Sequence, residues 1–220
     1  MAQDIIAILQ GKVGPQVGAD GAKFELRQDR LGALVIASRG GAYREAVARG
    51  NVYIQAVKSA TVTATTDISP LPATTGRALV GVINPLGSGK NISILEIGIA
   101  TVSGTPGGPF YIDVVPNCGV AASLAASSSP VNALSLQASG SAGRGLAAAV
   151  PAQAAVGTML RPLGGLAAVA TGAGIASIKE VIDGGIELPP NSLLAITAHA
   201  TGTSQVISGY IMWEEIPLPV

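Results

Sequence analysis

The sequence has few of the residues on which most enzymes and nucleic-acid-binding proteins depend. Of its 220 residues, one is cysteine, one is histidine and one is tryptophan, and aromatic residues make up only 3%. Charged residues make up 12%, about half the usual share of ~25%. Thirteen basic and thirteen acidic residues cancel, so the chain lacks the strong basic stripe of a nucleic-acid footprint. We therefore expect no nucleic-acid partner.

The scarcity of cysteine and histidine limits the chemistry further. Cys118 is alone, which excludes an internal disulfide and a paired thiolate ligand. His199 has no cysteine or carboxylate at ligand spacing, so we expect neither a metal site nor a cofactor. It would have to be the base of any Ser-His-Asp hydrolase, but the chain has no Gly-x-Ser-x-Gly elbow. Glu214 and Glu215 are adjacent, and adjacent strand residues point to opposite faces. We therefore expect no catalytic residues and no enzymatic activity.

Long apolar runs are also missing. The longest uncharged stretches are interrupted by proline, glycine, serine and asparagine, so none is typical of a transmembrane helix. The first four residues, Met-Ala-Gln-Asp, lack the basic region of a signal peptide. We therefore expect no membrane partner. The low charge leaves the surface poorly protected against association. This fits either a compact domain with little surface or a surface that other subunits cover in large part.

What the chain does have is a strong β pattern in its centre, residues 76–100 (GRALVGVINPLGSGKNISILEIGIA). Two runs rich in β-branched residues, 78–83 and 92–100, flank a turn with a proline and two glycines. This pattern predicts an interior hairpin of a two-layer β fold. With a period of two, the second run places Leu95, Ile97 and Ile99 on one face and Ile92 and Ile94 on the other.

Shorter runs of the same kind occur on both sides of this centre, separated by turns rich in glycine and proline. Many short strands of this sort are typical of sandwiches and barrels. We therefore predict an all-β fold, an antiparallel β-sandwich of jelly-roll type with one or two short helices. Further strands are expected at 34–36, 51–54, 61–66, 110–115, 186–188, 193–198 and 206–215, the last two joined by a hairpin loop at 200–204.

Residues 87–90, Gly-Ser-Gly-Lys, are similar to part of a phosphate-binding P-loop. That motif needs a glycine five residues before its Gly-Lys pair and a hydroxyl residue after the lysine, where this chain has Asn84 and Asn91. A helix must also follow the loop, whereas the pattern here predicts a strand. We therefore expect a polar turn and no nucleotide.

The first 22 residues are expected to form an N-terminal arm outside a single β-sandwich domain of residues 23–220. Asp4 suits the N-cap of a short helix at 4–10, and a glycine-rich connection follows. Such a helix is too short to be stable alone, so we expect it to dock on a neighbouring chain. The candidate interface residues of the arm are Asp4, Ile5, Ile8 and Leu9.

A second short helix is predicted at 42–49, where helix formers precede a glycine. Arg39, Arg44 and Arg49 lie in or beside it. These arginines could form an anion site, and the alternative interpretation is solvated charges or ion pairs with a neighbouring subunit. All three are therefore interface candidates.

Residues 119–178 are dominated by alanine, glycine and serine, and Arg144 and Arg161 are their only charged residues. Such small side chains bury little area each. We predict an ordered excursion with short strands that packs against neighbouring chains. Ala148 and Ala168 are its candidate interface residues.

Four stretches of the chain carry a resemblance to a known group of proteins. They are LRQDRLG at 26–32, YREAVARGNV at 43–52, NPLGSG at 84–89 before an isoleucine-rich strand, and ATGTS at 200–204 leading to WEEIP at 213–217. Together they resemble virion proteins of tailed bacteriophages, similar in build to jelly-roll capsid decoration or cement proteins. The motifs are structural, so the resemblance indicates a shared fold more than a shared activity.

The resemblance implies a non-enzymatic structural protein on the capsid surface of a virion. Its partners would be the major capsid protein and further copies of itself, as a homotrimer, because closed rings satisfy identical interfaces. The sandwich would bridge and stabilise neighbouring capsid subunits through many weak contacts. The alternative is a tail, baseplate or fibre component that attaches to the host surface, and that version should show an exposed aromatic or polar groove.

Overall fold

A computed structural model describes residues 43–62, 78–103, 109–119, 129–138, 140–147, 157–165, 177–198 and 205–218. The chain divides into two compact units, residues 1–44 and 45–220, and every described strand belongs to the second. The predicted arm, the helix at 4–10 and the strand at 34–36 lie outside the described residues.

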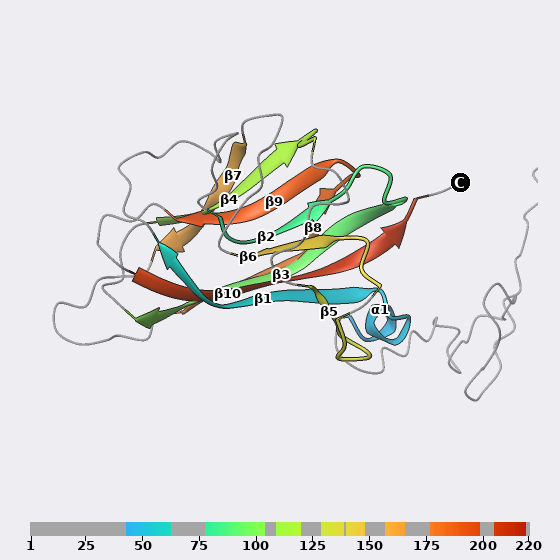
Figure 1. The fold of residues 1–220 in the computed structure, drawn as a ribbon, viewed down its shortest axis with the longest axis horizontal. Helices are drawn as coiled ribbons and strands as arrows, with labels where there is room; N and C mark the ends of the chain where they lie inside the picture. Colours follow the sequence, from blue (N-terminus) through green and yellow to red (C-terminus); the bar gives the residue numbers. More distant parts are fainter. Residues whose placement is uncertain are drawn as a thin grey trace, which may run out of the picture. The chain divides into compact units, whose positions relative to one another are not determined.

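The described fold consists of two five-stranded antiparallel sheets packed face to face (Figure 1). Sheet 1 has the order β5-β1-β10-β3-β8, and sheet 2 has the order β6-β2-β9-β4-β7. The predicted antiparallel β-sandwich is therefore confirmed. The strands are β1 Val52–Val62, β2 Ala78–Asn84, β3 Lys90–Ser103, β4 Pro109–Pro116, β5 Val131–Asn132, β6 Arg144–Ala147, β7 Thr158–Gly165, β8 Ser177–Leu188, β9 Ser192–Ala198 and β10 Gln205–Pro217.

The strands pair in a nested pattern along the chain. β1 pairs with β10, β2 with β9, β3 with β8, and β4 with β7, all antiparallel. Two further pairings, β10 with β3 and β4 with β9, join neighbouring pairs into the two sheets. The chain therefore alternates between the sheets at most of its connections, and first and last strands lie side by side.

The core fills the space between the two sheets. Its largest fully buried side chains are Trp213 and Phe110, and isoleucine, leucine and valine make up most of the rest. The Tyr53 ring stacks on Trp213 with the ring centroids 6.3 Å apart. A second buried cluster contains Ile83, Val115 and Leu193, which alternate along their strands with residues of the main core, so it lies on the outer face of sheet 2.

The predicted hairpin at 78–100 is wrong. β2 belongs to sheet 2 and β3 to sheet 1, so the turn between them carries the chain from one sheet to the other. The buried Asn84 stabilises this crossing, because its Nδ2 donates to the main-chain oxygens of Lys90 and Leu188, both at 2.8 Å. Two apolar strands joined by a turn can pair with each other or face each other across a core, and the local pattern is the same in both cases.

The predicted hairpin between 193–198 and 206–215 is wrong for the same reason. β9 pairs with β2 and β4 in sheet 2, and β10 pairs with β1 and β3 in sheet 1. The strands themselves are confirmed, as is the strand at 110–115. The strand predicted at 186–188 is the end of the longer β8, and the strand at 51–54 continues as β1 to Val62.

The predicted division of faces in β3 is also wrong. Ile92, Ile94, Ile97 and Ile99 all belong to the core between the sheets. The reason is an irregularity at Leu95, which has no pairing partner, because the register shifts there against both β10 and β8. A β-bulge inserts one residue and so reverses the alternation beyond it.

The short helix predicted at 42–49 is confirmed as α1, Arg44–Ala48. It ends where predicted, because Gly50 has a φ of 73° and its N–H donates to Val47 O at 2.9 Å. The short strands predicted within 119–178 are also confirmed as β5, β6 and β7. They pair with β1, β2 and β4 of the same chain through main-chain hydrogen bonds, which require no side-chain bulk.

Candidate functional site

Several described segments meet at one end of the sandwich, which we call the α1 end. It comprises α1, β5 with the turn 133–137 that follows it, the connection 85–89 between β2 and β3, and the end of β10 with Leu218 (Figure 1). Main-chain hydrogen bonds connect these segments: Ala133 N donates to Val52 O, Glu215 N to Asn51 O, and Leu218 N to Gly89 O.

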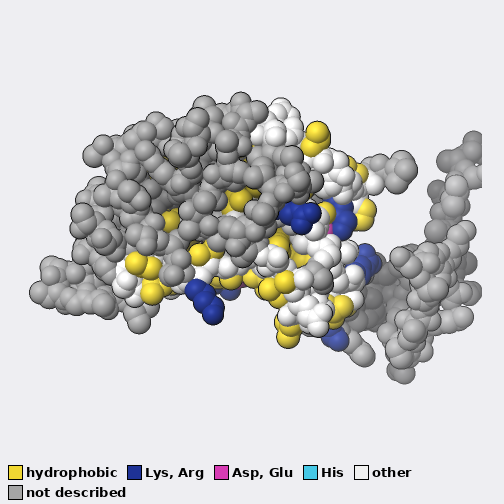
Figure 2. Space-filling view, in the orientation of Figure 1, with side chains coloured by type: hydrophobic (Ala, Val, Ile, Leu, Met, Phe, Trp, Pro, Cys, Tyr) yellow, Lys and Arg dark blue, Asp and Glu magenta, His cyan; other side chains and the backbone are white. Residues whose placement is uncertain are grey.

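The α1 end exposes large hydrophobic side chains. Six of the ten exposed large hydrophobic residues in the described part of the chain lie there, and Leu136 is the most exposed at 78%. Figure 2 shows hydrophobic atoms at this end of the molecule. Single exposed apolar residues are normal on a protein surface, but a concentration at one end is typical of an interaction site. The six residues are Leu86, Val131, Leu134, Leu136, Ile216 and Leu218.

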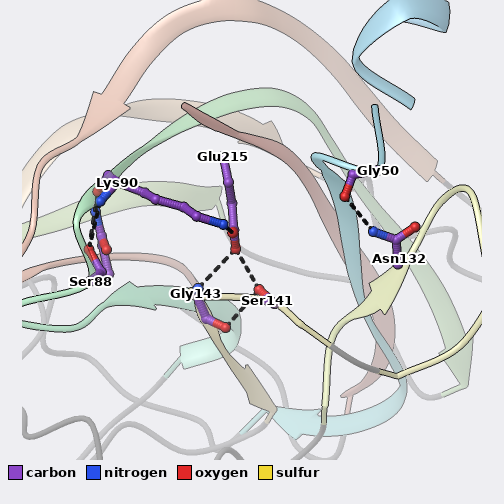
Figure 3. Close-up of polar contacts among 8 residues, drawn as sticks. Gly50, Ser88, Lys90, Asn132, Ser141, Gly143 and Glu215 are labelled. Carbon is purple, nitrogen blue, oxygen red and sulfur yellow. Dashed lines mark hydrogen bonds and ion pairs between the residues drawn. The ribbon is translucent and has the colours of Figure 1, made fainter. Parts of the chain in front are cut away.

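Asn132 organises the part of this surface that carries Leu134 and Leu136. Its Oδ1 accepts hydrogen bonds from the N–H groups of Leu134 and Ser135, at 2.9 and 3.1 Å. Its Nδ2 donates to Gly50 O at 2.7 Å (Figure 3). The turn is therefore tied to the end of α1, and these partly buried hydrogen bonds hold its exposed leucines in place.

A buried carboxylate lies beneath the same end. Glu215 is 0% exposed, and Lys90 Nζ lies 2.8 Å from its Oε2 (Figure 3). Its Oε1 accepts hydrogen bonds from Ser141 Oγ at 2.7 Å and from Gly143 N at 3.0 Å. Glu215 thus connects the start of β3, the end of β10 and the segment before β6.

The surroundings of Glu215 make it a poor proton acceptor. Burial raises the pKa of this carboxyl, but the hydrogen bonds from Gly143, Lys90 and Ser141 outweigh burial and hold the pKa below its usual range. A general base works best with a pKa near the working pH. The arrangement therefore suits a structural anchor and does not favour proton transfer.

The Gly-Ser-Gly-Lys segment is used within the fold. Lys90 begins β3, so the strand predicted after it is confirmed. Its ammonium group is committed to Glu215, and Ser88 Oγ donates to the main-chain oxygen of Lys90 at 3.1 Å. Both polar side chains of the segment therefore serve the turn itself.

A second candidate surface is a groove on the outer face of sheet 1, called here the Tyr210 groove. Its volume is about 430 Å³, and it is lined among others by Ala56, Ala100, Ser177, Lys179, Ser208 and Tyr210. Tyr210 Oη donates a short hydrogen bond to Glu96 Oε1, and Lys179 Nζ lies 2.9 Å from Glu96 Oε2. β10, β3 and β8 each contribute one residue to this polar cluster.

Only some of the predicted site residues belong to the described part of the chain. Arg44 and Arg49 lie in and directly after α1 and are exposed at the α1 end. Asp4, Ile5, Ile8, Leu9, Arg39, Ala148 and Ala168 lie outside the described residues, as does His199. Cys118 is buried and forms no disulfide. Glu214 and Glu215 lie on opposite sides of β10 as predicted, since only Glu215 is buried.

Sequence reasoning missed both polar clusters. Glu215 follows Trp213 at a spacing of two, which places it on the core side, so the sequence contained a signal for a buried carboxylate. The pairing of Tyr210 with Glu96 had no such signal, because it depends on strands that are 114 residues apart in sequence.

Within the described ranges, no group of three or more histidine, cysteine, aspartate or glutamate residues could hold a metal ion. No helix among these residues has the length and hydrophobicity needed to cross a membrane. No protein-family model, curated protein or solved structure matches the chain.

Proposed function

We propose that this chain is a non-enzymatic structural protein of a tailed-bacteriophage virion, a decoration or cement protein that binds the assembled shell. The observation that carries the binding role is the concentration of exposed hydrophobic side chains at the α1 end. The virion setting and the capsid-surface location rest on the sequence resemblance described above. The partners would be the major capsid protein and further copies of this chain.

We infer that the sandwich is a jelly roll. The nested pairing of β1 with β10, β2 with β9, β3 with β8 and β4 with β7 supports this connectivity, because a jelly roll is one long antiparallel hairpin rolled into two sheets. β5 and β6 would then be additions at the edges beside β1 and β2. Such a fold places the start of β1 and the end of β10 side by side at one end, where a shell could be contacted.

A homotrimer remains the proposed oligomer. The chain has a formal net charge of zero and few charges, which leaves little repulsion between copies. A specific interface should bury more than about 1,000 Å² in total. Mass photometry of the purified protein tests this, and a stable monomer would contradict it.

The binding role is tested by co-sedimentation with undecorated shells. The double variant Leu134→Ser with Leu136→Ser removes exposed apolar area from the α1 end without altering Asn132. The control is Met159→Ser with Leu160→Ser, which removes two exposed apolar side chains from the edge strand β7. We expect the first variant to lose shell binding and the control to keep it.

Two results of this experiment would contradict the proposed binding role. If the wild-type protein does not sediment with shells and antibody labelling places it on the tail, the decoration role is wrong. If it sediments but both variants bind equally well, the α1 end is not the contact surface. The proposed role of the arm is tested in parallel, since removal of residues 1–21 should weaken incorporation into particles and leave the sandwich folded.

A tail, baseplate or fibre component that attaches to the host surface is the second candidate function. The Tyr210 groove favours it, because an attachment protein is expected to show an exposed aromatic or polar groove. Immunogold labelling of whole particles separates the two candidates, since a decoration protein labels the capsid and an attachment protein labels the tail.

A further inference from the structure

Three side chains on neighbouring strands fix the wall of the Tyr210 groove. Tyr210 on β10 pairs with Gly98 on β3, and Gly98 pairs with Lys179 on β8. Glu96 lies two residues before Gly98 and so on the same face, where it accepts from Tyr210 Oη and pairs with Lys179. The phenol ring is therefore held at its outer end by a carboxylate that is itself held by a lysine.

Gly98 provides the space for the ring. A β-carbon at this position would lie 2.1 Å from Tyr210 Cε1 and 2.7 Å from Cζ, closer than any real contact. The ring therefore rests directly over the main chain of β3. A ring fixed in this way loses little conformational freedom when a ligand binds, which favours affinity.

The floor of the groove beside Tyr210 consists of small residues. Ala56 pairs with Tyr210, Ser208 pairs with Ala100, and Ala100 pairs with Ser177, so these residues share the outer face with the ring. The volume of about 430 Å³ falls within the range of about 300–1,000 Å³ that is typical of small-molecule sites. The small floor and the fixed ring together make a groove that is open from the solvent side.

The charges of the groove select a neutral ligand. Lys179 is the only charged residue among those that line it, and Glu96 offsets its charge at 2.9 Å. An anion would gain little from Lys179, because Glu96 already pairs with it, and a metal ion would find no carboxylate among the residues that line the groove. The lining is mostly apolar, since Val57, Ile99 and Ile178 also contribute to it, and its polar groups come from Ser177, Ser208, Lys179 and Tyr210. A ligand with an apolar face and hydroxyl groups therefore fits better than a purely apolar one, which would leave the serine hydroxyls without partners.

We propose that the Tyr210 groove binds a neutral saccharide. The C–H groups on one face of a sugar ring suit the electron-rich face of a phenol ring, and its hydroxyl groups can pair with serine hydroxyls and a lysine ammonium group. Tyr210 provides the stacking surface, and Ser177, Ser208 and Lys179 provide the hydrogen-bonding groups. The biological role of saccharide binding, attachment to a host surface, rests on the second proposed function. The groove itself is the same wherever in a particle the protein lies.

The test is saturation-transfer NMR on the full chain with neutral probes: glucose, galactose, mannose, N-acetylglucosamine and the disaccharides of each. We expect at least one probe to receive saturation at its ring C–H protons. Tyr210→Ala should weaken its binding by about tenfold, the loss expected for one aromatic stacking contact. Tyr111→Ala is the matched control, because Tyr111 lies on β4 in the other sheet, and it should leave binding unchanged.

A second variant keeps the test decisive if Tyr210→Ala does not fold. Ser177→Trp adds a bulky side chain at the exposed start of β8 and should block the groove while leaving Tyr210, Glu96 and Lys179 in place. Absence of binding to every probe overturns the proposal, as does binding that survives Ser177→Trp. These results are independent of particle labelling, so a failure here is distinct from a failure of the proposed virion role.

Discussion

Asn84 Nδ2 donates a 2.8 Å hydrogen bond to the main-chain oxygen of Leu188, which lies 104 residues later in the sequence. Asn84 ends β2 in sheet 2, and Leu188 ends β8 in sheet 1. The side chain is 0% exposed, and the same nitrogen also donates to Lys90 O. One buried amide thus connects both sheets at the place where the chain crosses between them.

Replacement of this amide should therefore destabilise the whole sandwich. Asn84→Asp puts a carboxylate oxygen against two carbonyl oxygens, so we expect the free energy of unfolding to fall by roughly 3 kcal/mol or more. Asn117→Asp is the matched control, because Asn117 is exposed and should change stability by less than about 0.5 kcal/mol. Urea unfolding followed by the fluorescence of Trp213, which is fully buried, measures both. Equal stability of the two variants would contradict the role assigned to Asn84.

The ion pair between Lys90 and Glu215 should contribute more than the surface ion pairs do. Lys90→Met leaves a buried carboxylate without its cation, and we expect a loss of roughly 3 kcal/mol, the lower end of the range for a broken buried pair, since Lys90 is partly exposed. Arg161→Met breaks the exposed pair with Glu180 and should cost less than about 1 kcal/mol. The same urea titration compares them, and a smaller loss for Lys90→Met than for Arg161→Met would refute this ranking.

Acid should weaken the fold through Glu215. Its folded pKa lies below the unfolded value of about 4.3, because the hydrogen bonds from Gly143, Lys90 and Ser141 outweigh the effect of burial. The folded state then binds fewer protons, so this stabilisation is complete above the unfolded pKa and is lost as pH falls through the folded pKa. Glu96 has the same sign, since Tyr210 and Lys179 together outweigh its burial. In unfolding titrations between about pH 7 and pH 3, Glu215→Gln should lose less stability than the wild type, and an equal loss would count against this assignment.

Alkali should weaken the fold through Tyr210. Burial, followed by the hydrogen bond to Glu96 and its charge, raises the pKa of Tyr210 to about 12. The neutral phenol is therefore favoured in the folded state, and its contribution is complete below the unfolded pKa of about 10 and declines as pH rises towards 12. Tyr210→Phe should show a shallower decline over this range, measured by chemical unfolding at several pH values. A decline as steep as that of the wild type would show that other groups cause it.

Local residue patterns determined the class of the fold and most of its strands. Runs rich in β-branched and other apolar residues predicted β2, β3, β4, β9 and β10, because such side chains favour the pleated surface of a sheet. The end of α1 could also be predicted from the local sequence, because Gly50 adopts a positive φ that glycine tolerates without strain. The exclusion of an internal disulfide also followed from the count of one cysteine.

Only the tertiary structure decided which strands are neighbours and which polar groups meet. The connections 85–89 and 199–204 have the composition of hairpin turns, yet their flanking strands lie in opposite sheets, because pairing depends on partners far along the chain. The bulge at Leu95 brought Ile92 and Ile99 to the same face of β3, whereas an unbroken alternation would place them on opposite faces. The clusters at Glu215 and Tyr210 likewise join residues from separate strands, and their geometry depends on long-range register, which local composition does not determine.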